Sequence, residues 1–248
     1  MPSKLSQILD TLERLFGSQK LAGPTDPYEM IVFLNCGYPA SDAKCMSGFE
    51  ALRREVGLQA KKILAAPNAK LAKVMRPSVI MPSVCAERLK EIARKVSDEL
   101  KGDLTAVLTK RMRGAKEEPE KGLKAAKRVL QEFPVIGEPS AEKILLFSGL
   151  APIAAVPSAF VDVPVRLFMG ESAKNYAADY RAAREILDSG LPKSSEARQR
   201  SYLLLKKHGQ EICKRSKPNC EVCPLTSKCA YLQAKAADAN RVSTGPHE

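Results

Sequence analysis

Histidine is nearly absent from the sequence, which contains His208 and His247 and no tryptophan. A Ser-His-Asp triad or a histidine-based zinc site therefore has almost no material. No apolar run approaches the about 18 residues that a membrane helix needs, and no glycine-rich phosphate loop of the nucleotide-binding types is present. The first residues lack the continuous apolar core of a signal peptide. We therefore expect a cytoplasmic protein with no membrane partner.

The composition is that of a folded and strongly basic chain. Its 248 residues are 44% hydrophobic, and 40 Lys and Arg against 28 Asp and Glu give a net charge of +12. This length suits one large domain or two small ones. The charge favours a polyanionic partner, although a basic surface can also serve solubility alone.

Apolar residues recur at helical spacing along most of the chain. Leu5, Ile8, Leu9 and Leu12 follow the i, i+3, i+4, i+7 pattern of one buried helix face. No region shows sustained alternation of apolar and polar residues, so a sheet is not expected. The sequence therefore predicts an all-α fold, followed by a small, polar and disordered tail at 233–248.

Four of the seven cysteines cluster near the C-terminal end in the pattern C-x6-C-x2-C-x5-C. They are Cys213, Cys220, Cys223 and Cys229. Four thiolates in so short a stretch can bind one soft metal centre, and they suit an iron–sulfur cluster as well as zinc. Disulfides or unrelated buried thiols are the alternatives, but an odd cysteine total argues against a secreted disulfide scaffold. The remaining Cys36, Cys45 and Cys85 are predicted to be buried apolar residues.

Residues 121–150 predict two helices joined by a tight turn. The turn reads FPVIG at 133–137, and Pro139 suits the first turn of the second helix. Free backbone amides and the helix dipole at such a point form a site for a phosphate, without sequence-specific contacts. Taken alone the turn is weak evidence, because short helical hairpins occur in many bundles.

The cysteine spacing resembles the cluster loop of endonuclease III-like DNA glycosylases. The stretch LLLKKHGQEIC at 203–213 also resembles that family, and the turn resembles its helix–hairpin–helix, which usually reads L-P-G-[VI]-G. The resemblance, which covers about residues 26–230, implies a [4Fe–4S] cluster bound by the four cysteines. It also implies two helical lobes with the DNA groove between them. These are residues 26–145, ending in the helix–hairpin–helix (about 121–150), and residues 1–25 with 146–232.

Double-stranded DNA, damaged or intact, is the partner that the resemblance implies for a nucleoid-associated monomer. The expected DNA contacts lie in the hairpin and the cluster loop, at Val135, Gly137, Ser140, Lys214, Arg215 and Lys217. Val135 replaces the first glycine of the family turn, and a β-branched residue is costly at positive φ. Either the turn is remodelled or phosphate binding is weakened, and Glu138 beside the site would also repel a phosphate.

The two catalytic positions of the family differ in this chain. Bifunctional members carry a nucleophilic lysine two residues after the last hairpin glycine, where this sequence has Pro139. Matching the stretch 155–167 to the family places Pro157 where a water-activating aspartate belongs. Proline cannot form the Schiff base that β-elimination requires. Asp162 and Lys143 are the remaining catalytic candidates, and a solvated Lys143 is the expectation.

Three hypotheses for the function follow. The first is a DNA-binding protein of base excision repair, for which monofunctional glycosylase activity is open and bifunctional lyase activity is not expected. The second is a catalytically silent or reassigned member that binds DNA, including damaged DNA, and keeps the fold and cluster. The third is a structural protein, stabilised by zinc or a cluster, that has lost DNA binding.

Overall fold

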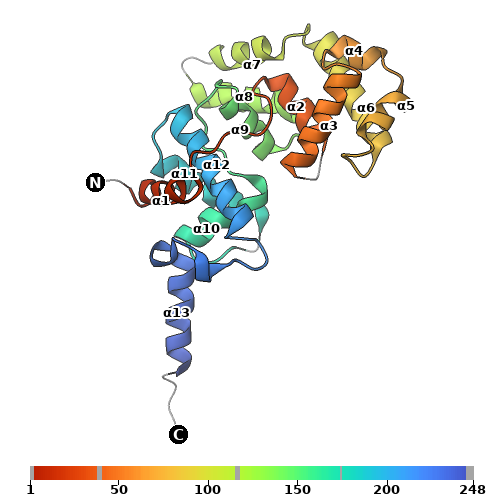
Figure 1. The fold of residues 1–248 in the computed structure, drawn as a ribbon. Coiled ribbons are helices and arrows are strands. Elements are labelled where there is room, and N and C mark those ends of the chain that lie inside the picture. Colours follow the sequence, from red (N-terminus) through yellow and green to blue (C-terminus); the bar gives the residue numbers. More distant parts are fainter. Residues whose placement is uncertain (1–2, 38–40, 115–117, 174, 244–248) are drawn as a thin grey trace. The chain divides into compact units, whose positions relative to one another are not determined.

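The computed structural model describes residues 3–37, 41–114, 118–173 and 175–243, and every regular element within them is helical. The prediction of an all-α fold is confirmed. The chain divides into two compact units, residues 21–151 and residues 1–20 with 152–248 (Figure 1). Residues 21–25 and 146–151, which the sequence assigned to the other lobe, belong to the first of these units. The end of α9 explains the difference for residues 146–151, because the Ala151 amide donates to the Leu145 carbonyl at 3.0 Å.

The unit 21–151 is a helical bundle around a central apolar helix. Its elements are α2 (Pro27–Asn35), α3 (Asp42–Glu55), α4 (Ala60–Ala65), α5 (Asn68–Met75), α6 (Pro82–Arg94), the π-helical turn η1 (Lys95–Glu99), α7 (Leu104–Arg113), α8 (Pro119–Gln131) and α9 (Glu138–Phe147). Met30, Ile31, Val32 and Phe33 of α2 are all buried, so this helix is enclosed on every side. It packs against α3, α6, α7 and α9.

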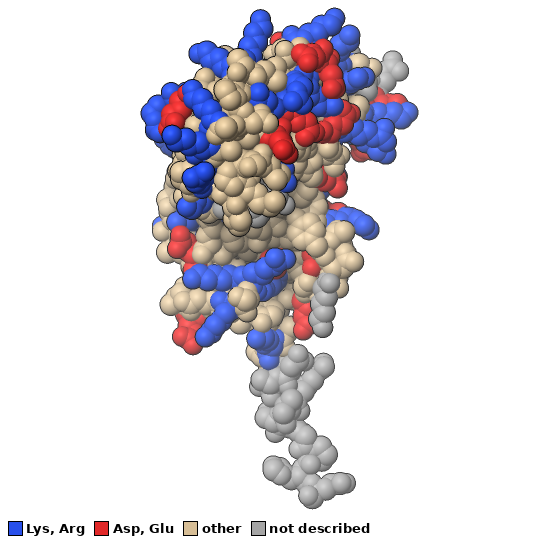
Figure 2. All heavy atoms as spheres, turned by 90° about the vertical axis from the view of Figure 1, so that its right-hand side faces the viewer, with Lys and Arg blue, Asp and Glu red and all other residues tan. Residues whose placement is uncertain are grey.

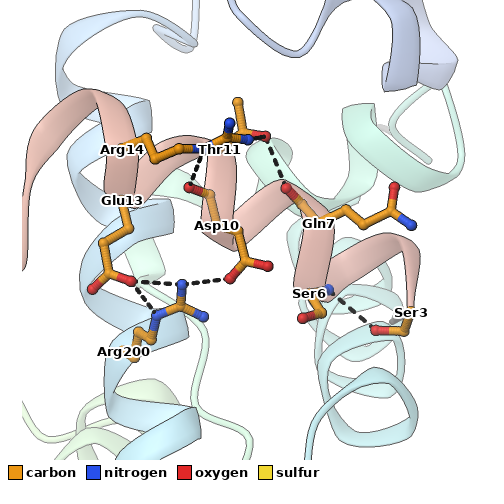
Figure 3. A network of polar contacts seen from close by, with 8 residues as sticks. All are labelled: Ser3, Ser6, Gln7, Asp10, Thr11, Glu13, Arg14 and Arg200. Carbon is orange, nitrogen blue, oxygen red and sulfur yellow. Dashed lines mark hydrogen bonds and ion pairs between the residues drawn. The ribbon is translucent and has the colours of Figure 1, made fainter. Parts of the chain in front are cut away.

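The second unit joins the N-terminal helix to the C-terminal third of the chain. Its elements are α1 (Lys4–Phe16), η2 (Ser158–Phe160), α10 (Asp162–Phe168), α11 (Tyr176–Gly190), α12 (Ser195–Glu211), η3 (Cys220–Val222), η4 (Thr226–Lys228) and α13 (Ala230–Ser243). The apolar face predicted for α1 is buried against α11 and α12. Figure 3 shows the polar edge of this contact, where Arg200 of α12 bonds to Asp10 at 2.8 Å and to Glu13 at 2.9 Å. Such partly exposed pairs contribute about 0–1 kcal/mol, so apolar burial carries most of the contact.

The C-terminal segment is helical where a disordered tail was predicted. α13 runs from Ala230 to Ser243, and the prediction is wrong for that part, while residues 244–248 lie outside the described residues. Alanine recurs through α13 and has the highest helix propensity, and Tyr231 and Leu232 anchor the first turn on the apolar core. No helix in the described ranges is both long and apolar enough to span a membrane.

Candidate functional site

The turn between α8 and α9 is fixed by two buried side chains. Phe133 and Ile136 are 3% and 4% exposed, and the Ile136 amide donates to the Phe133 carbonyl at 3.2 Å. Pro134 and Val135 lie between them, and Val135 has a φ of +59°. These are the features of a type II turn, whose third residue is usually glycine. The turn is therefore not remodelled, and valine occupies the left-handed position.

Unbonded backbone amides gather at the N-terminus of α9. Among the described residues, the amides of Val135, Gly137 and Ser140 have no hydrogen-bond acceptor. Gly137 is the N-cap residue, with an extended backbone at φ −86° and ψ −177°. Three free amides at the positive end of a ten-residue helix form an anion site. The structure thus brings together the three hairpin residues that the sequence predicted to contact DNA.

Carboxylates flank this anion site. Glu138, the first residue of α9, forms an ion pair with Lys127 of α8 at 2.7 Å. Lys127 also pairs at 3.0 Å with Glu142, whose side chain is fully buried. Glu138 occupies the end of the helix dipole that a phosphate would use, so its negative charge competes with the phosphate.

Lys143 lies on the same helix and is only 6% exposed. The prediction of a solvated Lys143 is wrong, because every residue from 141 to 147 of α9 is buried. A buried lysine is screened from a DNA substrate. Its position therefore argues against a role as the replacement nucleophile.

Asn35, at the end of α2, connects the hairpin to the start of α6. Its Nδ2 donates to the Pro134 carbonyl at 3.1 Å, and its backbone carbonyl accepts from the Cys85 Sγ at 3.4 Å. Asn35 is 2% exposed, so these bonds lie inside the packed unit. The hairpin turn and the first turn of α6 are consequently neighbours.

An exposed apolar pair lies directly before α6. Ile80 and Met81 are 87% and 63% exposed, and Ile80 is the most exposed large apolar side chain of the described residues. The sequence pattern did not predict the pair as functional, although its place between Pro77 and Pro82 is typical of a loop tip. Ile and Met are among the apolar side chains that DNA-bending proteins insert between base steps.

The four cysteines of the array line one small cavity of about 20 Å³ in the other unit. Cys213 follows α12, Cys220 and Cys223 belong to the η3 region, and Cys229 precedes α13. All seven cysteines are free thiols, and Cys36, Cys45 and Cys85 are buried as predicted. Within the described residues, no three or more His, Cys, Asp or Glu side chains stand close enough to bind a metal ion. The four thiols therefore share a cavity without yet converging on one centre.

Arg166 of α10 fastens the start of the cysteine loop. Its guanidinium donates to the carbonyls of Lys214 at 3.0 Å and Arg215 at 2.6 Å, and it lies 3.6 Å from the Cys213 Sγ. Asp162 lies one turn earlier, with its Oδ2 3.2 Å from the Arg166 Nη1. The structure thus places Asp162 as a partner of Arg166, which argues against a free catalytic carboxylate.

Burial sets the protonation of the groups around the cavity. His208 is 1% exposed, its Nε2 lies 3.9 Å from the Cys223 Sγ, and burial lowers its pKa to about 4. Burial raises the pKa of Cys213, against the opposing effect of the Arg166 guanidinium, and raises the pKa of Cys223. These thiols are protonated at neutral pH in the metal-free chain, so a bound metal centre must displace their protons.

The basic residues predicted to contact DNA lie on the outside of the loop. Lys214, Arg215 and Lys217 are exposed, while Arg166 holds only the backbone carbonyls of the first two. Lys214 and Lys217 border a surface groove that Lys235 of α13 also lines. Lys235 was missed because the tail was expected to be disordered.

The two positions that depart from the family pattern occupy ordinary structural roles. Pro139 lies in the first turn of α9, where a missing amide costs nothing. Pro157 is buried at the N-cap of η2, and its carbonyl accepts from the Phe160 amide at 2.9 Å. Neither residue offers a nucleophile or a base.

No protein-family model matches the sequence, and no curated protein matches it. Solved structures do resemble it. A non-covalent endonuclease III–DNA complex superposes with a TM-score of 0.71 at 17% identity, covering 96% of this chain and 100% of that chain. A trapped endonuclease III–DNA covalent intermediate superposes with a TM-score of 0.70 at 18% identity, covering 95% of this chain and 100% of that chain. A thermostable thymine-DNA glycosylase superposes with a TM-score of 0.70 at 20% identity, covering 93% of this chain and 97% of that chain. The chain therefore has the all-α fold of the endonuclease III-like DNA glycosylases.

Proposed function

We propose that this chain is a DNA-binding protein of the base-excision-repair type, without β-lyase chemistry. The observation that carries the proposal is the group of free amides of Val135, Gly137 and Ser140 at the start of α9. Backbone amides at a helix end bind phosphate whatever the base sequence. Double-stranded DNA is consequently the expected partner of a monomer that acts at the nucleoid.

The exposed pair Ile80 and Met81 is an argument for binding to a duplex that is opened at one base step. Apolar side chains inserted between bases unstack them, and enzymes that read a single base take it out of the helix. The bonds of Asn35 keep this tip near the hairpin within one rigid bundle. Phosphate binding and base-step opening would therefore act on the same stretch of DNA.

The donor set of the cavity fits an iron–sulfur cluster. Cys213, Cys220, Cys223 and Cys229 would hold it, since four thiols line one space and thiolates are the usual ligands of [4Fe–4S] clusters. Such a cluster would cross-link the loop through its metal–thiolate bonds and would supply a redox centre. Arg166 already orders the backbone of this loop, so Lys214 and Lys217 would be presented to a phosphate backbone.

Iron and zinc analysis of the purified protein tests the metal assignment. About four irons per chain with visible cluster absorption support it, whereas stoichiometric zinc alone contradicts it.

Monofunctional glycosylase activity is the second candidate, favoured by the likeness to the thymine-DNA glycosylase structure. It requires a group that activates water, and the Asp162–Arg166 pair leaves Asp162 poorly placed for that task. A panel of duplexes carrying different damaged bases separates the two functions. Base release that disappears in Asp162→Asn supports the glycosylase, whereas binding to the panel without turnover supports a silent binding protein.

Duplex binding itself is the primary test. Fluorescence anisotropy with a labelled duplex should give an affinity that falls steeply as salt increases, because phosphate contacts release counterions. Borohydride treatment with abasic DNA should trap no covalent adduct. A salt-independent affinity, or no measurable binding at about 50 mM salt, would refute the proposal.

A further inference from the structure

One stretch of the bundle carries charge of a single sign. Between Glu55 and Glu87 the sequence has no acidic residue and five basic ones, which are Lys61, Lys62, Lys70, Lys73 and Arg76. All five side chains are exposed, and in the part of the chain that the structure describes none has an ionic partner. Some cations elsewhere on the surface are paired, as in Lys121–Glu118 at 2.6 Å and Lys207–Glu211 at 2.6 Å. This stretch therefore carries positive charge that no acidic residue within it compensates, unlike the surface of mixed charge that solubility alone needs.

Three of these cations form one row, which we name the α5 stripe: Lys70, Lys73 and Arg76. Their spacing of three residues keeps them on one side of α5, and they span about 9 Å along its axis. The opposite side of the helix, with Leu71, Val74 and Met75, is buried. The exposed side of α5 thus presents charge with no large apolar residue of its own.

The stripe leads directly to the exposed apolar tip. Arg76 caps the end of α5, and the next residue, Pro77, accepts a hydrogen bond from the Lys44 Nζ at 3.2 Å. A fourth cation therefore lies between the stripe and Ile80. Figure 2 shows the side of the molecule on which α5 lies, where Lys and Arg side chains are prominent over the upper part of the view, with Asp and Glu side chains among them.

Carboxylates on the neighbouring helices do not neutralise the stripe. Glu50 and Glu55 of α3 are bound to Arg53 and Arg54 at 2.9 Å each. Glu87 and Glu91 of α6 are exposed, and α6 also carries Arg88, Lys90 and Arg94.

We infer that the α5 stripe binds the phosphate backbone of the DNA duplex on the flank of the Ile80–Met81 tip, an inference that rests on the proposed function. A duplex carries one charge per about 1.7 Å of its axis, so a row of about 9 Å faces several phosphates. A membrane surface is a poorer fit, because interfacial helices need a broad exposed apolar face and α5 has buried its own. The stripe holds the DNA without reading its sequence.

Two triple variants of equal charge test the inference. In the stripe variant, Lys70→Gln, Lys73→Gln and Arg76→Gln remove unpaired cations. In the control, Arg53→Gln, Lys121→Gln and Lys207→Gln remove three cations that each pair with a glutamate, two of them exposed and Lys207 half-buried. Circular dichroism and thermal unfolding verify that both variants fold.

The slope of log affinity against log salt is the decisive readout. The stripe variant should lose about 2 to 3 units of slope, with equally weakened binding to unrelated duplexes, while the control changes by less than about 1 unit. Equal changes in both variants, or no change in the stripe variant, would overturn the inference. Binding to phosphatidylserine vesicles that only the stripe variant loses, with an unchanged DNA slope, would assign the stripe to a membrane instead. Absence of DNA binding by the parent protein would refute the proposed function itself.

Discussion

Val135 holds a backbone conformation that its side chain disfavours. At a φ of +59°, a residue with a Cβ carries a penalty of about 1–2 kcal/mol. Glycine removes the penalty but adds about 0.4–1 kcal/mol of conformational freedom to the unfolded chain relative to alanine. Val135→Gly should therefore be more stable than Val135→Ala by roughly 0.5–1 kcal/mol. Comparing these two variants cancels most of the lost burial of the valine methyl groups.

Urea unfolding of four variants measures this difference. Lys124, exposed in the middle of α8, is the matched position. There the alanine variant should have a free energy of unfolding about 1 kcal/mol higher than the glycine variant. The glycine variant should thus be the more stable one at position 135, and the alanine variant the more stable one at position 124. If glycine is the worse residue at both, position 135 is not left-handed and the type II turn is wrong. The glycine variant should also bind duplex DNA more tightly, because it removes the side chain beside the free amides.

Three further predictions concern charge and protonation. Glu138→Gln should raise duplex affinity about 2- to 5-fold at low salt, since the carboxylate no longer competes for the helix end; an unchanged anisotropy titration contradicts this. Arg166→Gln should lower thermal stability and metal content together, because it loses the hydrogen bonds from the charged guanidinium to the loop carbonyls, worth about 1.5–3 kcal/mol each. A metal content equal to that of the parent protein would refute the role of Arg166 in ordering the loop. Burial raises the pKa of Cys85 to about 11, so the folded state keeps a proton that the unfolded state loses above pH 9. Unfolding free energy should therefore fall between pH 9 and 11, and the fall should be smaller in Cys85→Ala.

Features written in a short stretch of sequence were predictable. The cysteine array lies within one loop, so its spacing was enough to predict that the four thiols lie around one cavity. The hairpin was marked by a proline and a glycine around two apolar residues. In both cases the relevant contacts form between near neighbours in the chain.

Features that depend on distant contacts were not predictable. Asn35 reaches a carbonyl 99 residues away, and Arg166 reaches one 48 residues away. Nothing in their local sequence marks these partners. Lys143 was misjudged for the same reason, because other parts of the bundle enclose α9. The tail was misjudged because its alanines were taken as small loop residues, although alanine favours the helix.

Pro139 offers a way to ask whether binding and chemistry are separable in this scaffold. The first turn of a helix accepts most residues, and Pro139 is only partly buried, so Pro139→Lys should change stability by less than about 1 kcal/mol. Pro157→Asp is expected to cost more, because it buries a carboxylate without a partner. If position 139 faces the abasic sugar, Pro139→Lys should yield a borohydride-trapped adduct that the parent protein does not form. Trapping must disappear in Pro139→Gln, which keeps a polar side chain but has no amine. Tight DNA binding by Pro139→Lys without any adduct would show that the hairpin presents a different residue to the sugar, and would overturn the register that places Pro139 at the family's lysine.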